Sequence, residues 1–408
     1  MQLSVAYTFE PGILKRLARF PHVKEVYGCR GSDFIGSGRA SYTLRPVSSP
    51  GIESAVREAH AEGIFFNYLL NAASLYGMEQ TREGNRRIRR IIDRLSLWGV
   101  DALTVSLPYL LRIIKKHYPA LRVRIGAFAV VDSPEKARQW EDLGADTLCL
   151  SAIACNRDFE RLSRIRSSVQ CGLQLIANAS CLPSCAWENT HMHVLTQGSL
   201  KNHRLRGFCF DYCFVQCSKK RLEDPVNIIR SIWIRPEDLS VYEQIGYRDF
   251  KLVERSCPGD LLIRRVAAYS EGKFNGNLWE LVAPVAWISR GQKAPLSSIA
   301  RMLSMLIRPR FIRIASMLAL KRYSELVIPH DFSKETAGVF IDNGLLDGFL
   351  EGLRAMDCGR RVRACDNCDY CAKWAKKAVS IDEAWRKKAL TLANELDDGV
   401  VSGDAWGI

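Results

Sequence analysis

Residues 97–106 read Leu-Trp-Gly-Val-Asp-Ala-Leu-Thr-Val-Ser, and this pattern recurs twice more along the chain. Residues 142–151 read Asp-Leu-Gly-Ala-Asp-Thr-Leu-Cys-Leu-Ser, and residues 244–253 read Gln-Ile-Gly-Tyr-Arg-Asp-Phe-Lys-Leu-Val. In each copy a glycine ends a helix, a polar turn follows and a buried strand begins. Strands that alternate with helices in this way predict a parallel sheet, because parallel neighbours are joined by helical crossovers.

The same alternation extends over about the first 270 residues. The predicted strands are Leu3–Tyr7, Lys24–Gly28, Ile64–Leu69, Ala102–Ser106, Val123–Phe128, Thr147–Ser151, Leu173–Ala177, Ser231–Arg235 and Phe250–Glu254. Apolar residues three and four positions apart predict helices at 51–61, 85–98, 109–118, 134–143 and 157–167. Eight strand–helix units would close a (β/α)8, TIM-like barrel of about 250 residues, so one of the nine strands must lie elsewhere. A doubly wound open sheet is the alternative.

The alternation stops near residue 275. We therefore assign residues 1–275 to the barrel and residues 276–408 to a mainly helical C-terminal extension. Within the extension, the helix-like stretches are 298–322, which Pro309 interrupts, 333–356 and 372–397.

The chain of 408 residues carries 58 Lys and Arg against 44 Asp and Glu, a formal net charge of +14. This charge favours anionic partners, such as a small molecule, a peptide or RNA. The densest basic runs are Arg82, Arg86, Arg87, Arg89, Arg90 and Arg94, and then Arg308, Arg310, Arg313, Lys321 and Arg322. Ordinary solvated helix faces are the alternative interpretation of both runs. No apolar run is long enough for a membrane span and no signal peptide is evident, so we predict a cytoplasmic location.

Five cysteines follow the strand predicted at Leu173–Ala177: Cys181, Cys185, Cys209, Cys213 and Cys217. Thiolates gathered this densely in a reducing compartment suggest a soft metal or an iron–sulfur cluster. Ordinary buried cysteines are the alternative. Because the seventh strand precedes them, we expect the first pair at the carboxyl end of the barrel, where such folds carry their chemistry. Polar residues at other strand ends would share that mouth: Asn71, Ser106, Ser151, Asn178, Glu254 and Arg255.

A second cysteine group lies in the extension: Cys358, Cys365, Cys368 and Cys371. Successive two-residue gaps resemble the runs that wrap an iron–sulfur cubane. A structural zinc ion is the alternative for these four thiols.

The order of these features resembles the U32 family, long called collagenase-like peptidases. Members have a barrel core, a cysteine set after a late strand, and a strand that ends in a Lys-Ile-Glu-Gly-Arg-like sequence. The corresponding strand here is Phe250-Lys251-Leu-Val-Glu254-Arg255, and the resemblance covers about residues 60–275. The chain departs from the family at Glu254-Arg255-Ser256, which lacks the glycine. The second cysteine group is also not general in the family.

The resemblance implies the iron–sulfur, non-peptidase branch of that family. Several members bind a [4Fe-4S] cluster through four cysteines and support oxygen-independent hydroxylation, in ubiquinone synthesis or on RNA bases. Prephenate is the oxygen donor in some. Carried over, the implied cofactor ligands are Cys181, Cys185, Cys213 and Cys217, with Cys257 at a position used in some relatives and Cys209 as a further candidate.

Residue type assigns roles around that centre. Glu254, Glu188, His191 and His193 are proton-transfer candidates, and Lys251 and Arg255 are candidates for holding an anionic substrate. The leading hypothesis is an iron–sulfur redox enzyme that hydroxylates, or transfers an atom to, a small-molecule, peptide or RNA substrate, with an electron-donor protein as partner.

Two alternatives remain on sequence grounds. A U32-type peptidase agrees with the older family name, although the chain has neither His-Glu-x-x-His nor Gly-x-Ser-x-Gly. An RNA-binding or RNA-modifying protein with a structural metal site agrees with the net charge, although no distinct RNA-binding module is visible.

Overall fold

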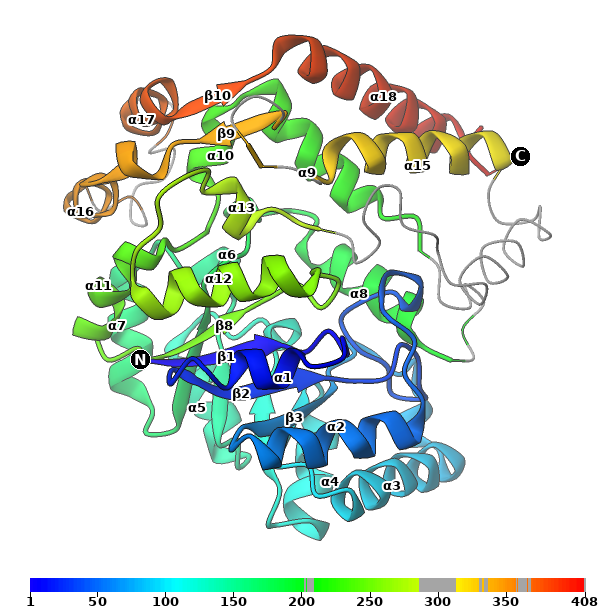
Figure 1. Cartoon of the computed structure of the whole chain (residues 1–408). Helices are drawn as coiled ribbons and strands as arrows, with labels where there is room; N and C mark the ends of the chain where they lie inside the picture. Colours follow the sequence, from blue (N-terminus) through cyan, green and yellow to red (C-terminus); the bar gives the residue numbers. More distant parts are fainter. Residues whose placement is uncertain are drawn as a thin grey trace.

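The computed structural model describes the whole chain except residues 202, 204–208, 286–312, 330–331, 334–336, 357, 359–364, 366–367 and 407–408. Its centre is a closed barrel of eight strands in chain order, each parallel to the next and β8 parallel to β1. Helices surround the barrel, and the last helices of the chain gather on one side of it (Figure 1). The protein thus has the predicted (β/α)8, TIM-like fold with a C-terminal extension rich in helices.

The barrel strands are β1 (Gln2–Ala6), β2 (Val23–Gly28), β3 (Phe65–Leu70), β4 (Ala102–Val105), β5 (Arg122–Ile125), β6 (Thr147–Cys149), β7 (Gly172–Ile176) and β8 (Asp249–Leu252). The helices of this part are α1 (Ile13–Leu17), α2 (Ser49–Ala61), α3 (Arg82–Leu97), α4 (Pro108–His117), α5 (Pro134–Asp142), α6 (Ala152–Cys155), α7 (Phe159–Ser168), α8 (Glu188–Ser199), α9 (Tyr212–Glu223), α10 (Val226–Arg230), α11 (Leu239–Gln244) and α12 (Gly259–Glu271).

Eight of the nine predicted strands are confirmed, and the strand predicted at Ser231–Arg235 is wrong. That segment runs beside the loop after β7, outside the barrel. The Ile232 N–H donates to the Cys181 carbonyl at 3.0 Å, and the Ile234 N–H donates to the Ala177 carbonyl at 2.8 Å. The eighth place belongs to β8, which pairs with both β7 and β1.

The three repeated junctions form as predicted. Gly99, Gly144 and Gly246 follow α3, α5 and α11 with φ angles of 76°, 100° and 90°. Only glycine adopts this left-handed conformation at little cost, so each junction turns the chain sharply from a helix back into the barrel.

A buried ion-pair network lies inside the barrel. The Arg124 guanidinium of β5 lies 2.9 Å from a Glu25 carboxylate oxygen of β2 and 3.0 Å from an Asp249 oxygen of β8. Gln174 of β7 also donates to Asp249, at 2.8 Å. These bonds join four strands across the interior.

The extension contains α13 (Trp279–Val282), α15 (Ile314–Val327), β9 (Val339–Ile341), α16 (Phe349–Ala355), α17 (Tyr370–Ala378), β10 (Val379–Ile381) and α18 (Glu383–Ser402). The helices predicted at 333–356 and 372–397 are each wrong in part, because β9 and β10 interrupt them and pair as a two-stranded antiparallel sheet. Of the helix predicted at 298–322, α15 covers the part from Ile314; Pro309, Arg308 and Arg310 lie outside the described residues. No helix in the described ranges combines the length and apolar character needed to cross a bilayer.

The extension packs directly on α9. Val215 and Leu222 of α9 share one apolar cluster with residues of α15 and α18, among them Tyr323 and Ala393. The Arg386 side chain of α18 donates to the last carbonyls of α9, reaching the Leu222 oxygen at 2.6 Å. The position of α9 is therefore set partly by the far end of the chain.

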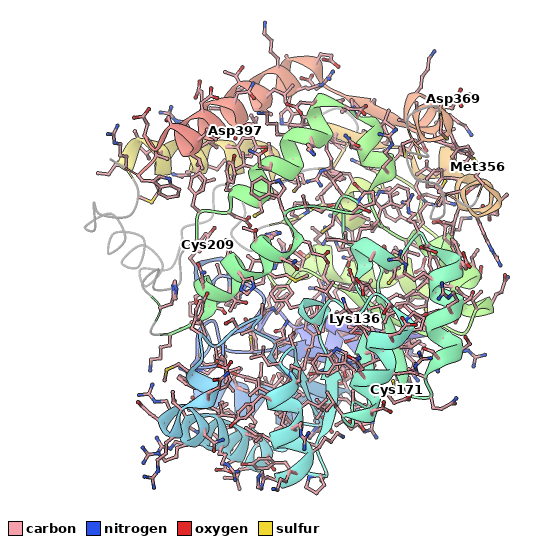
Figure 2. The ribbon with its side chains drawn as sticks, turned by 180° about the vertical axis from the view of Figure 1, so that it is seen from behind. Lys136, Cys171, Cys209, Met356, Asp369 and Asp397 are labelled. Carbon is pink, nitrogen blue, oxygen red and sulfur yellow. The ribbon has the colours of Figure 1, made fainter. Side chains whose placement is uncertain are left out.

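Asp397 of α18 accepts hydrogen bonds from side chains of α9 (Figure 2). We therefore expect Asp397→Asn to weaken the packing of α18 on α9. Lys219 donates to the Asp397 carboxylate at 2.7 Å, and Gln216 donates to it at 2.8 Å. Burial acts to raise the pKa of Asp397, but the bonds from Lys219 and Tyr212 outweigh it and lower the pKa. The variant should lose about 1–2 kcal/mol of unfolding free energy at pH 7.

The pH dependence of this loss has a defined sign. A carboxyl whose pKa is lower in the folded state stabilises the fold above its unfolded pKa of about 3.9. That contribution disappears as the pH falls through the folded-state pKa. Denaturant unfolding of both proteins between pH 7 and pH 3 measures the difference. A difference that does not shrink below about pH 4 would contradict the assignment to this carboxylate.

Candidate functional site

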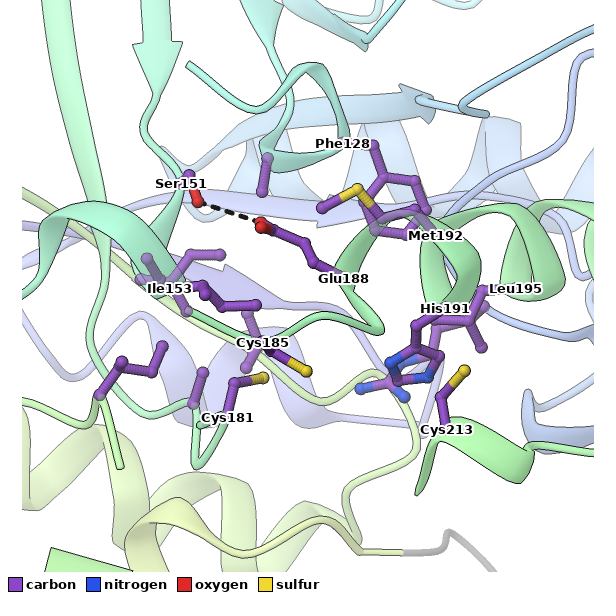
Figure 3. Close-up of a pocket in the computed structure, with 18 of the residues that line it drawn as sticks. Phe128, Ser151, Ile153, Cys181, Cys185, Glu188, His191, Met192, Leu195 and Cys213 are labelled. Atoms are coloured by element: carbon purple, nitrogen blue, oxygen red, sulfur yellow. Dashed lines mark hydrogen bonds between the residues drawn. The ribbon is translucent and has the colours of Figure 1, made fainter. Parts of the chain in front are cut away.

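A cavity of about 260 Å³ opens at the carboxyl ends of the barrel strands. Residues just past strand ends supply part of its wall: Asn71 follows β3, Ser151 follows β6, Ala179 follows β7, and Glu254 follows β8. Side chains of α8 and α9 supply another part (Figure 3). This is the end of the barrel at which (β/α)8 enzymes carry their chemistry.

Four predicted ligands, Cys181, Cys185, Cys213 and Cys217, line this cavity. Cys181 and Cys185 lie in the loop after β7, and their sulfur atoms point the same way (Figure 3). Cys213 and Cys217 lie in the first turns of α9, whose amino end is capped by the Asp211 side chain. A spacing of four residues places both thiols on one helix face. The structure thus brings together thiols from two separate segments.

The protein alone disfavours thiolates at these positions. Burial raises the pKa of Cys181 to about 12 and the pKa of Cys213 to about 12. Burial also raises the pKa of Cys217. Cys181 is exposed, but its exposed surface faces the cavity, whose walls are formed by other parts of the protein. Because metal ligands must be thiolates, a bound metal centre or a nearby cation has to stabilise the charged form.

The chemistry of these donors fits an iron–sulfur cluster. Four sulfur donors select a soft metal or such a cluster. Tetrahedral zinc would bring the sulfurs to about 3.8 Å from one another, since Zn–S bonds are about 2.3 Å. In the described part of the chain, no three His, Cys, Asp or Glu side chains are arranged to hold a single metal ion. The thiols border one cavity, and their fit to a cluster rests on the type and number of the donors.

The two further cysteine candidates lie off the cavity wall. Cys209 is buried against Ala40 and Leu195 just before α9 (Figure 2). Cys257 is buried beyond β8, where burial raises its pKa to about 11 and the Arg265 charge opposes the shift. A ligand role for either stays a prediction.

The predicted residues of β8 also reach the cavity. Lys251, Glu254 and Arg255 line it, and only 6% of Glu254 is exposed. Arg39, in the loop between β2 and α2, donates to a Glu254 carboxylate oxygen at 2.8 Å. We did not predict Arg39 from the sequence. The sequence feature that could have indicated Arg39 is the long segment 29–48 between β2 and α2. A segment of this length after a strand end lies at the mouth of the barrel.

Two cations at the cavity wall have no carboxylate within ion-pair distance among the described residues. The Lys251 ammonium lies 4.0 Å from the ring centroid of Tyr27, and burial lowers the pKa of Lys251. Arg255 donates to the Cys29 sulfur at 2.7 Å and to the Ser37 hydroxyl at 3.2 Å. An anionic ligand would stabilise the charged form of the lysine and pair with the arginine.

Glu254 has a left-handed backbone, with φ of 103°. This conformation costs a residue with a side chain on the order of 1–3 kcal/mol. The ion pair with Arg39 and the Ser256 hydroxyl, which donates to the other carboxylate oxygen at 2.5 Å, hold it in place. Strain of this kind concentrates at active sites, which supports a functional role for Glu254.

Two titratable side chains of α8 also line the cavity (Figure 3). His191 Nε2 lies 3.1 Å from an Asp211 carboxylate oxygen. Glu188 accepts a hydrogen bond from the Ser151 hydroxyl at 3.0 Å, and burial raises the pKa of Glu188. His193 is exposed and does not line the cavity. His191 and Glu188 are therefore placed for proton transfer, and His193 is not.

The second cysteine group lies on the extension, where α17 packs against α10. Cys371 is in the first turn of α17, and Cys368 lies just before that helix. Burial raises the pKa of Cys371, while the Arg157 charge opposes it and the charges of Cys358 and Cys365 add to it. At least three of these thiols thus lie within electrostatic range of one another, away from the barrel cavity.

The fold and site define a (β/α)8 protein with thiols and an ion-paired carboxylate at its mouth. The sequence profile of peptidase family U32 matches residues 30–247, more than half of the chain. The chain therefore belongs to peptidase family U32, as the residue order indicated.

Individual relatives share between 21% and 27% of their aligned residues with this chain. An uncharacterized protease of Methanocaldococcus jannaschii is 27% identical over 350 residues, which cover 86% of this chain and 87% of that protein. A tRNA hydroxylation protein of Escherichia coli K12 is 22% identical over 165 residues, covering 40% of this chain and 34% of that protein. A solved U32 peptidase structure aligns with a TM-score of 0.46 at 21% identity, covering 62% of this chain and 93% of that one.

Proposed function

We propose that this protein is an iron–sulfur-dependent U32 enzyme that carries out oxygen-independent hydroxylation, or a related atom transfer, on an anionic substrate. One observation carries the proposal. The thiols of Cys181, Cys185, Cys213 and Cys217 border the same cavity as the buried carboxylate of Glu254. A set of soft-metal ligands and a candidate acid–base group thus face one space at the functional end of the barrel.

The side chains around the cavity take separate roles in this proposal. The four cysteines hold a [4Fe-4S] cluster, which would supply electron transfer when bound. Lys251 and Arg255 bind the anionic group of a substrate or oxygen donor. Glu254, positioned by Arg39, accepts or returns a proton at its carboxylate. Apolar side chains such as Phe128 keep bulk water out of the cavity.

Hydroxylation without dioxygen requires an oxygen donor. The substrate carbon loses two electrons when C–H becomes C–OH. An anionic organic donor gains two electrons when it gives up its oxygen, so the transfer needs no external oxidant. An electron-donor protein then serves only to set the oxidation state of the metal centre.

RNA is the substrate class that we favour. The net charge of +14 and the similarity to the Escherichia coli tRNA hydroxylation protein support it. Four exposed arginines also recur at four-residue spacing along α3: Arg82, Arg86, Arg90 and Arg94. Side chains at this spacing lie along one helix face, and such a row of cations suits a polyanion.

A thiol peptidase is the second candidate, because His191 and Cys213 line the same cavity and His191 contacts Asp211. The relatives named as proteases support it too. A nucleophilic cysteine, however, needs a lowered pKa, whereas burial raises the pKa of Cys213. No hydrogen bond joins the Cys213 thiol to His191 in the part of the chain that the structure describes. The geometry therefore favours ligation over nucleophilic attack.

Anaerobic purification tests the metal centre. We expect iron, acid-labile sulfide and a brown visible absorption. We also propose that Cys358, Cys365, Cys368 and Cys371 hold a second cluster or a zinc ion. Two clusters would give about eight irons per chain, and one cluster with zinc would give about four irons and one zinc. Zinc without visible absorption would reject the cluster at the barrel mouth.

Analysis of RNA tests the reaction. We expect one nucleoside to gain the mass of an oxygen atom in cells that produce the protein under anaerobic conditions. The same nucleoside should stay unmodified in cells that lack the gene or that produce Cys181→Ser protein. Mass spectrometry of digested total RNA makes the comparison. An identical nucleoside profile in all three strains would exclude RNA hydroxylation and leave small molecules and peptides.

A further inference from the structure

Arg221 is a buried arginine of α9 that touches both segments of the thiol set. Only 5% of the residue is exposed. One guanidinium nitrogen donates to the Ser180 carbonyl at 2.7 Å, directly before Cys181 in the chain. The other lies 3.4 Å from the Cys217 sulfur, one helical turn away on α9. A single side chain thus joins the loop after β7 to the helix that carries the second thiol pair.

The charge of Arg221 lacks the usual kind of partner. Within the described residues, no carboxylate lies within ion-pair distance of it; its other close neighbour is the Trp279 ring, at 6.0 Å from the guanidinium carbon. A buried cation without an anion is costly. The Cys217 sulfur, at 3.4 Å, is the group beside Arg221 that becomes negative when it ligates a metal centre.

We propose that Arg221 is the positioning residue of the thiol centre: it fixes the Cys181 loop against α9 and sets the reduction potential of the bound cluster. The proposal rests on the proposed function, because it needs a cluster at these thiols. A fixed positive charge favours the more negative, reduced form of a cluster. A hydrogen bond to a ligand sulfur acts in the same direction, since charge and such bonds both tune the potential.

Substitutions at Arg221 separate charge from hydrogen bonding. Arg221→Met keeps most of the side-chain volume and removes both, whereas Arg221→Lys keeps the charge and loses the forked donor. Arg386→Met is the matched control, because Arg386 also bonds the α9 backbone but reaches no thiol. Anaerobic dye titration, followed by visible absorption and electron paramagnetic resonance, measures the midpoint potential of each protein. Iron content and circular dichroism are measured alongside.

We expect Arg221→Met to shift the reduction equilibrium at least tenfold towards the oxidised form, a lowering of 59 mV for one electron. The midpoint potential of Arg221→Lys should fall between those of Arg221→Met and the wild type. The iron-loaded fraction of Arg386→Met should have the wild-type potential. Loss of iron from Arg221→Met with unchanged circular dichroism would support the positioning role directly. If Arg221→Met does not fold, a lowered potential in Arg221→Lys supports the proposal.

Two results would overturn this inference. One is a wild-type potential in an iron-loaded Arg221→Met protein. The other, where Arg221→Met does not fold, is a wild-type potential in Arg221→Lys. Wild-type protein without iron is a different failure: it would reject the proposed function itself, and the role of Arg221 would fall with it.

Discussion

Single replacement of Cys181, Cys185, Cys213 or Cys217 by serine is expected to remove the iron of the barrel-mouth centre. Each of these thiols lines the cavity at the carboxyl ends of the strands. A serine hydroxyl is a harder and far less acidic ligand than a thiol, so it does not replace a thiolate on a soft centre. Iron and sulfide analysis of anaerobically purified variants should show a drop of about four irons per chain. The visible absorption should fall in proportion.

Two cysteines close to the site provide matched controls. Cys209 and Cys257 are buried in the same region but do not line the cavity. We expect Cys209→Ser and Cys257→Ser to keep their iron, although each loses some stability by placing a hydroxyl in an apolar site. Loss of iron in Cys257→Ser, with full iron in one of the four cavity variants, would show that Cys257 is a ligand instead.

Replacement of Arg39 by methionine is expected to destabilise the fold by about 3 kcal/mol. Arg39 is the cation within ion-pair distance of the buried Glu254 carboxylate in the described structure. Removal of one partner leaves a buried charge uncompensated, which costs more than the pair itself contributes. Glu254 also occupies a strained backbone conformation, so the lost contact no longer offsets that strain. Denaturant unfolding of the variant measures the change.

A second substitution should reverse much of this loss. In Arg39→Met/Glu254→Gln the carboxylate charge is removed together with its partner, so we expect the double variant to be more stable than Arg39→Met alone. A double-mutant cycle with Glu254→Gln gives the coupling energy. Arg57→Met on α2 is the control, because Arg57 pairs with the exposed Glu53 and surface pairs contribute at most about 1 kcal/mol. Equal stability of Arg39→Met and the double variant would show that the ion pair does not hold Glu254.

The barrel could be predicted because its signals are local and repeated. A glycine, a polar turn and an apolar strand occupy one short window, as at Gly99 and Gly144. The strand predicted at Ser231–Arg235 was wrong because this segment is extended and apolar like a barrel strand. Only its hydrogen bonds to the loop after β7 distinguish it from one. The sheet of β9 and β10 was not predicted, because a three-residue strand shows too little periodicity to separate it from a helix turn.

The site was predicted as far as residue type and spacing allow. Cysteine spacing indicated the group from Cys181 to Cys217, and the family resemblance selected the two pairs within it. The ends of predicted strands indicated Ser151 and Glu254. Arg39 was missed because it meets Glu254 across 215 positions of sequence. Arg221 was missed for another reason: on a helix with several basic residues, nothing local indicates which one points inward. Contacts between distant segments depend on the closed fold and leave no pattern in a single sequence.

The packing of α18 on α9 has a consequence for biosynthesis. The helix that offers Cys213 and Cys217 acquires its final support only when residues 383–402 have been translated and have docked. Cofactor insertion at these thiols would then follow translation of residues 383–402 rather than translation of α9 alone. Damage to α18, which contributes no thiol, should therefore reduce metal loading in the cell before it affects the barrel itself.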